Sequence, residues 1–185
     1  MFSERRVAQI AAFFTKAEGG RIAVLKLIKL MYLADRESLD QHGDPITFDA
    51  MYSLKEGPIL SRTLDFVNGI EESSPGGWDD WIADRDNREV EVKNTNFQRA
   101  QLDELSDADI EVLESVWEKF GHMNKWEIRD YTHDHCPEWK DPQGGRLPLP
   151  YRDVLQALGK SEEQIEHTER EILSINYLDH LFARL

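Results

Sequence analysis

The side chains with the most potential for chemistry lie in one short segment, YTHDHCPEW, residues 131–139. The segment holds His133, His135 and Cys136, and Zn²⁺ binds histidine and cysteine in tetrahedral sites. Adjacent His135 and Cys136 seldom bind one ion well, however, and no CxxC or HExxH spacing completes a ligand set. We therefore interpret the segment as a helix end without metal or cofactor, in which His133 bonds a backbone carbonyl and Trp139 fills the core.

The rest of the chain adds no catalytic pattern. It contains no Walker A loop, no GxGxxG and no GxSxG, and nothing around Cys136 resembles a cysteine-protease signature. The many carboxylates are spread along the chain and form no pair suited to acid–base catalysis. The sequence therefore favours a protein that binds over an enzyme. A metal-dependent hydrolase using His133, His135 and Cys136 is the least favoured alternative.

The charge of the chain restricts its partners. Lys and Arg total 22 and Asp and Glu total 36, a net charge of −14 that repels phosphate backbones. Direct binding to nucleic acid is therefore disfavoured and basic partners are favoured. Imitation of DNA by the acidic surface is a weaker possibility, because the basic residues are interleaved with the acidic ones.

The chain carries no sign of a membrane or secreted protein. Its N-terminal residues predict an amphipathic helix, and no run of about 18 apolar residues is present. The single cysteine excludes an internal disulfide and fits a reducing compartment. We expect a cytoplasmic protein with no membrane contact.

The elements that position these residues are mainly helical. The run IAVLKLIKLMYLA in the predicted helix 22–41 is apolar on nearly every face, which is typical of a buried central helix. Its two lysines, Lys26 and Lys29, are expected to snorkel or to pair with carboxylates. Ser3 is a candidate N-cap for a first helix. Three further capping pairs are Ser106 with Asp109, Asn124 with Glu127, and Ser161 with Gln164.

The strands are predicted from alternation. Apolar and polar residues alternate over 46–54, which predicts a strand, and Pro58 predicts the start of a helix over 58–68. Residues 78–93 predict a hairpin that joins the 46–54 strand in one sheet.

Together these elements indicate a mainly α (α+β) fold. We expect a single helical domain, residues 1–185, around a buried central helix, with a small β-hairpin or sheet. Residues 141–185 are expected to form a C-terminal helical extension packed on it. The apolar face of the last helix is expected at Ile165, Ile172, Ile175, Leu178 and Phe182.

Four stretches, 26–47, 48–61, 105–121 and 132–139, resemble the Panacea domain of SocA-like antitoxins. The resemblance covers roughly residues 5–140. It is carried by a lysine-bearing apolar helix that runs into Tyr-Leu-Ala-Asp, a Gly, a Pro-Ile-Thr turn and an aromatic segment ending in Gly-Pro. In this chain those positions are Lys29, Tyr32, Leu33, Ala34, Asp35, Gly43, Pro45, Ile46, Thr47, Tyr52, Gly57 and Pro58.

The resemblance implies an antitoxin that neutralises a protein toxin, often within prophage or mobile elements. The implied partner is a cognate toxin encoded by the adjacent gene, bound by direct protein–protein contact. An adaptor that delivers the toxin to an AAA+ protease is the alternative. The predicted partner-binding residues are Tyr52, Lys55, Gly57, Pro58, His133 and Trp139. For Gly57, Pro58 and Trp139, a role in holding the fold is the favoured interpretation.

Overall fold

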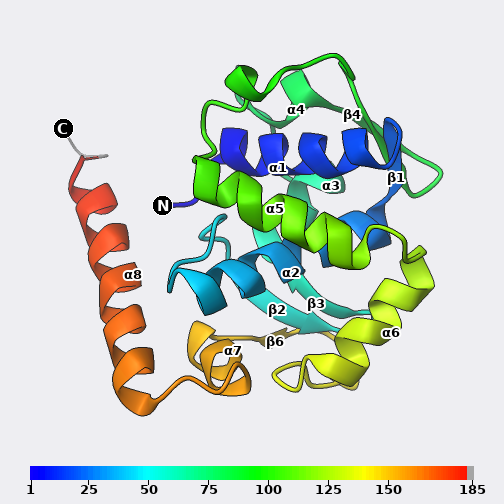
Figure 1. Cartoon of the computed structure of the whole chain (residues 1–185). Coiled ribbons are helices and arrows are strands. Elements are labelled where there is room, and N and C mark those ends of the chain that lie inside the picture. Colours follow the sequence, from blue (N-terminus) through cyan, green and yellow to red (C-terminus); the bar gives the residue numbers. More distant parts are fainter. Residues whose placement is uncertain (183–185) are drawn as a thin grey trace.

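The computed structural model describes the backbone of residues 1–182 and the side chains of 1–83, 87–175. At its centre lies α2 (Val24–Gln41), which is buried along most of its length and contacts α1, α5, α6 and β3. Figure 1 shows α5 crossing one side of α2 and a β-hairpin on the other. The predicted fold class, mainly α around a buried central helix, is confirmed.

Local capping chemistry starts the surrounding helices where it was predicted. The Ser3 hydroxyl accepts from the Arg6 N–H at the start of α1, and both Ser106 and Asn124 form complete capping boxes. These caps satisfy backbone N–H groups that lack a partner within the helix. The helices concerned are α1 (Glu4–Ala17), α5 (Asp107–Phe120) and α6 (Lys125–His135).

One antiparallel sheet has the order β3-β2-β6 and packs against α2 and α6 through β3. Its strands are β2 (Met51–Leu54), β3 (Gly57–Leu60) and β6 (Leu147–Pro148). The predicted helix start at Pro58 is wrong, because Pro58 lies in β3 opposite Ser53. An edge strand tolerates proline, since one side of its backbone needs no ladder partner.

Side chains distant in sequence explain where the following helix begins. The helix α3 (Ser61–Val67) has no side-chain cap of its own. The Asp49 carboxylate instead accepts from the backbone N–H groups of Arg62 and Thr63, at 3.1 and 2.8 Å. An anion at a helix N-terminus is favourable, so Asp49 sets the start of α3.

The predicted strand over 46–54 is wrong in its first half. Only 51–54 pair, because the Thr47 N–H and hydroxyl both donate to the Asp35 carboxylate on α2 instead of to a neighbouring strand. Phe48 then adopts a φ of 52°, which turns the chain away from extended geometry. The alternation reflects burial along an irregular segment.

The predicted hairpin is confirmed, but it joins a different sheet. The order β1-β5-β4 places β5 between β4 and a short strand that the sequence did not suggest, so its pairing with the 46–54 strand is wrong. This second sheet covers one end of α1. Its strands are β1 (Arg21–Ala23), β4 (Ile82–Asp86) and β5 (Glu89–Val92). The first residues of the predicted hairpin form the short helix α4 (Trp78–Trp81) instead, and the 3-10 turn η1 (Arg99–Gln101) leads on to α5.

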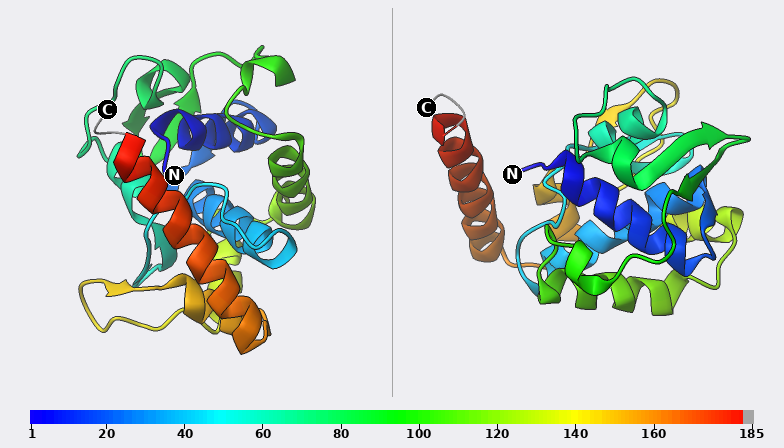
Figure 2. Two further views of the ribbon diagram at one scale, coloured as in Figure 1. Left: turned by 90° about the vertical axis from the view of Figure 1, so that its left-hand side faces the viewer. Right: turned by 90° about the horizontal axis from the view of Figure 1, so that it is seen from above.

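The C-terminal part contributes α7 (Tyr151–Ala157), which contacts α2, and α8 (Glu162–Phe182), which packs on α7. Figures 1 and 2 show α8 leaving α7 and running beside the body toward the side where the N-terminus lies. The Ser161–Gln164 cap is confirmed. Ile165 and Ile172 are buried, whereas the predicted face positions Leu178 and Phe182 lie outside the described side chains. A single domain with 141–185 as an extension stays a prediction.

No helix in the described part of the chain is both long enough and apolar enough to span a bilayer.

Candidate partner-binding site around the β2–β3 hairpin

The predicted binding residues gather where the β2–β3 turn meets the end of α6. The Trp139 indole donates from Nε1 to the carbonyl of Leu54 at 2.9 Å. The His133 ring stacks on Trp139 with 4.0 Å between ring centroids and 9° between the planes. The hairpin and the segment after α6 are therefore held together by contacts that span about eighty residues of sequence.

A buried lysine lies beneath the same turn. Lys29 on α2 is fully buried, and its Nζ donates to the carbonyl of Pro58 at 2.7 Å. Gly57 has a φ of +99°, and a Cβ at this position would lie 2.9 Å from both Lys29 Nζ and Thr132 Oγ1. The turn thus requires a glycine for its backbone conformation and for the close approach of Lys29.

The two lysines of α2 differ in their partners. Lys26 forms an ion pair with Glu18 and donates to the Gly121 carbonyl, as the prediction of pairing requires. For Lys29 the prediction is wrong, because the side chain is fully buried, its described hydrogen-bond acceptor is a carbonyl, and none of the described carboxylates lies within ion-pair distance. Burial lowers the pKa of Lys29 to about 7, although the nearby Glu56 carboxylate opposes this. A lysine on a wholly apolar helix was the one sequence signal for this feature.

The low pKa of Lys29 predicts a pH-dependent stability. The unfolded chain keeps the ordinary lysine pKa of about 10.4, so between pH 7 and that value it binds a proton that the folded protein lacks. The free energy of unfolding of the wild type should therefore rise with pH relative to that of Lys29→Met, by about 1 kcal/mol per pH unit. Below about pH 6 Lys29 is protonated in both the folded and the unfolded chain, so the difference in free energy of unfolding between the wild type and Lys29→Met should be constant. Urea denaturation across this range measures it, and a flat difference above pH 7 would show that Lys29 stays charged.

The six predicted binding residues take different positions. Gly57, Pro58 and Trp139 have the structural contacts described above, which agrees with the favoured interpretation. Lys55 is exposed at the turn, and Tyr52 is half-buried on β2, with the Arg146 guanidinium 4.6 Å from its ring centroid. Their role in partner binding stays a prediction.

His133 differs from its expected geometry. It was expected to bond a backbone carbonyl, but its Nε2 is buried without a hydrogen-bond partner among the described residues, and the ring is held by stacking on Trp139. Burial lowers the pKa of His133, and the positive charges of Lys29 and Arg129 lower it further. The imidazole is therefore neutral at neutral pH.

The described residues contain no group of three or more His, Cys, Asp or Glu side chains placed to hold a metal ion. Cys136 is buried, and burial raises its pKa to about 12, which keeps the thiol protonated. His135 instead lies against the ring of Tyr131, with 4.6 Å between the centroids. Cys136 and His133 are therefore packing residues, whereas His135 is exposed beside Tyr131.

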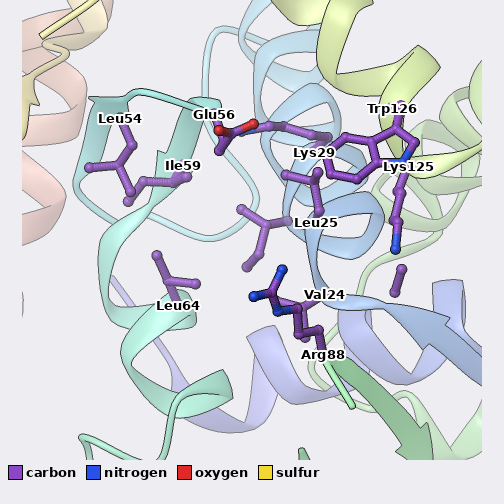
Figure 3. Close-up of a pocket in the computed structure, with 12 residues that line it drawn as sticks. Val24, Leu25, Lys29, Leu54, Glu56, Ile59, Leu64, Arg88, Lys125 and Trp126 are labelled. Carbon is purple, nitrogen blue, oxygen red and sulfur yellow. The ribbon is translucent and has the colours of Figure 1, made fainter. Parts of the chain in front are cut away.

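A cavity of about 420 Å³ opens beside the turn, between the N-terminal half of α2, the hairpin and the start of α6. Figure 3 shows aliphatic side chains around it, with Trp126 near Lys29 and Arg88 at the opposite side. Sequence reasoning missed this cavity because its lining comes from five separate segments. The lining includes Leu25, Lys29, Leu54, Glu56, Ile59, Leu64, Arg88, Lys125 and Trp126.

A buried network connects α2 to the segment after α6. The Glu138 carboxylate accepts from the Tyr32 hydroxyl and from Arg36 Nε, both at 2.6 Å. The side chain of Glu138 is 0% exposed and that of Arg36 is 20% exposed. Burial raises the pKa of Tyr32, and the Glu138 charge raises it further. Between Tyr32 and Arg36 on the same helix, Asp35 holds Thr47 as described above.

A comparison with known protein families finds a match. The family model described as "Antitoxin SocA-like, Panacea domain" matches residues 27–140, which run from the first half of α2 past the buried Glu138. No curated protein and no solved structure matches the chain. The matched segment covers more than half of the 185 residues and contains the hairpin, Lys29 and the 131–139 segment. The chain therefore belongs to the SocA-like antitoxin family and carries its Panacea domain over residues 27–140.

Proposed function

We propose that this protein neutralises a cognate protein toxin by binding it directly, and that it acts without catalysis. The observation that carries the proposal is the match of residues 27–140 to the antitoxin family. The toxin is expected to be the product of the adjacent gene. The cytoplasm, where such a toxin would act, is the proposed location.

The local structure supports binding over catalysis. The residues that first suggested chemistry, His133 and Cys136, are engaged in packing, and the thiol stays protonated. The cavity beside the hairpin is lined mainly by apolar side chains, half of Trp126 is exposed, and this combination suits a partner segment. The expected binding surface is therefore the outer side of the β2–β3 hairpin and the adjoining start of α6.

To test the proposal, the growth of cells that express the adjacent reading frame is compared with and without this protein. The two proteins are then co-purified. Relief of toxicity together with a stable complex is the expected result. Relief without a complex contradicts blockade by stoichiometric binding. The half-life of the toxin then separates the alternatives, because delivery to an AAA+ protease shortens it and blockade does not.

Charge reversal at Lys55 tests the predicted surface. Lys55 is exposed at the tip of the hairpin, so Lys55→Glu should change stability by no more than about 0.5 kcal/mol. If the toxin contacts this tip, a charge at the rim of the interface affects association, and the affinity should fall about tenfold. Calorimetric titration measures the affinity and thermal unfolding supplies the control. Unchanged affinity would place Lys55 outside the interface.

A further inference from the structure

The cavity beside the hairpin leaves apolar surface open to solvent. Leu25, Leu54 and Leu64 line it and are only half-buried, and Trp126 is 49% exposed. Its volume of about 420 Å³ lies within the range of ligand pockets, roughly 300–1,000 Å³. We call the lining of this cavity the hairpin groove. A segment that filled the groove would bury these leucines and the exposed face of Trp126.

The hairpin groove has a local charge opposite to that of the whole protein. The chain has a net charge of −14, yet the groove is lined by three basic side chains, Lys29, Arg88 and Lys125, and by one carboxylate, Glu56. That carboxylate is engaged elsewhere, since Glu56 forms an ion pair with Arg129 at 3.2 Å. An occupant with a negative charge would therefore complement the groove, whereas a cationic one would be repelled.

Lys29 is the basic residue of the groove that could bind a carboxylate at a defined position. An ammonium group has three N–H donors, and among the described residues the Pro58 carbonyl accepts one of them. Lys29 is one of the residues that line the groove and is 0% exposed, so its remaining donors are buried, where leaving a donor without an acceptor is unfavourable. Figure 3 shows the Lys29 side chain extending toward Glu56. A carboxylate entering the groove would supply the missing acceptor through charge-assisted hydrogen bonds.

We propose that the hairpin groove receives an apolar segment of the toxin that carries an aspartate or a glutamate, whose carboxylate accepts hydrogen bonds from Lys29. That the partner is a toxin rests on the proposed function. That the bound segment is apolar and acidic rests on the residues of the groove alone. The leucines and Trp126 bind the apolar side chains of the segment, and Arg88 and Lys125 attract its charge at the rim.

The chemistry of the groove is testable on the whole protein without the toxin. Octanoate and 1-octanol share an apolar chain and differ in the carboxylate, so calorimetric titration of each isolates the contribution of Lys29. We expect octanoate to bind at least about tenfold more tightly than octanol, and Lys29→Met to remove the preference. Trp126→Ala, at an exposed position, should weaken both ligands if Lys29→Met fails to fold. Equal binding of the two ligands, or none by the wild type, overturns the proposal.

Photo-crosslinking locates the toxin. We expect Trp126→p-benzoylphenylalanine to crosslink to the toxin, and the matched control Leu173→p-benzoylphenylalanine not to, because Leu173 is 67% exposed on α8, far from the groove. Replacing the acidic residue of the crosslinked toxin segment by its amide should weaken binding to the wild type and not to Lys29→Met.

The outcomes separate this inference from the proposed function. A stable complex that crosslinks from position 173 alone, or that Lys29→Met binds as the wild type does, overturns the inference and leaves the antitoxin function standing. Failure of the wild type to relieve toxicity or to form a complex removes the antitoxin function. If octanoate still binds selectively in that case, the groove serves a small carboxylate, and the peptide occupant proposed here is wrong.

Discussion

Replacing Glu138 by alanine is expected to lower the free energy of unfolding by about 3 kcal/mol. The Glu138 carboxylate is completely buried and accepts from both Tyr32 and Arg36 at 2.6 Å. Its removal leaves the Arg36 guanidinium without its partner and the Tyr32 hydroxyl without its acceptor. Breaking a buried ion pair costs about 3–5 kcal/mol for this reason, and the partial exposure of Arg36 places the expected value at the lower end.

Two matched variants sharpen this prediction. Glu138→Gln keeps an acceptor for Tyr32 and removes the charge. Its loss in free energy of unfolding should therefore lie between zero and that of Glu138→Ala. Glu71→Ala breaks an exposed ion pair with Arg62 and should cost no more than about 1 kcal/mol. Urea denaturation measures all three. Equal losses for Glu138→Ala and Glu71→Ala would show that burial adds nothing to the network.

Gly57→Ala is expected to lower the free energy of unfolding by about 2–4 kcal/mol. An alanine at a φ of +99° is strained by about 1–3 kcal/mol. Its Cβ would also lie 2.9 Å from Lys29 Nζ, so this buried group would have to shift. The displaced Lys29 would lose its bond to Pro58, so the same change should abolish the octanoate preference of the hairpin groove.

Gly19→Ala is the control for backbone strain, because Gly19 has a φ of +102° and nothing within 4 Å of its would-be Cβ. The difference between the two variants, measured by denaturation, isolates the steric contribution. If Gly57→Ala and Gly19→Ala lower the free energy of unfolding equally, the close approach of Lys29 to the turn does not contribute to the cost of Gly57→Ala.

The residues that carry the family resemblance mainly stabilise the fold through intramolecular hydrogen bonds. Tyr32 binds Glu138, Asp35 binds Thr47, and Lys29 binds the Pro58 carbonyl. Each of these contacts joins α2 to a residue that lies outside the helices. The partly exposed side chains of the proposed hairpin groove, such as Leu25 and Trp126, lie outside the recognised motif positions. A family motif therefore predicted the scaffold better than it predicted the surface.

The sequence by itself determined the central helix and the starts of α1, α5 and α6. The all-apolar pattern of α2 and the caps at Ser3, Ser106 and Asn124 depend on residues a few positions apart, so their effect is readable locally. The hairpin over 78–93 was readable for the same reason. The family could be recognised because its motif letters follow one another along the chain.

Only the tertiary structure decided the strand assignments and the candidate site. Pro58 lies in a strand because Lys29 donates to its carbonyl and Asp49 sets the helix start a few residues later. Both residues are distant in sequence, so a rule based on proline and its neighbours could not predict this. Trp139 reaches Leu54 across 85 positions. The hairpin groove exists because α2, the hairpin and α6 leave a space between their side chains. Periodicity in sequence predicts which face of an element is buried, but the shape between elements depends on how they pack.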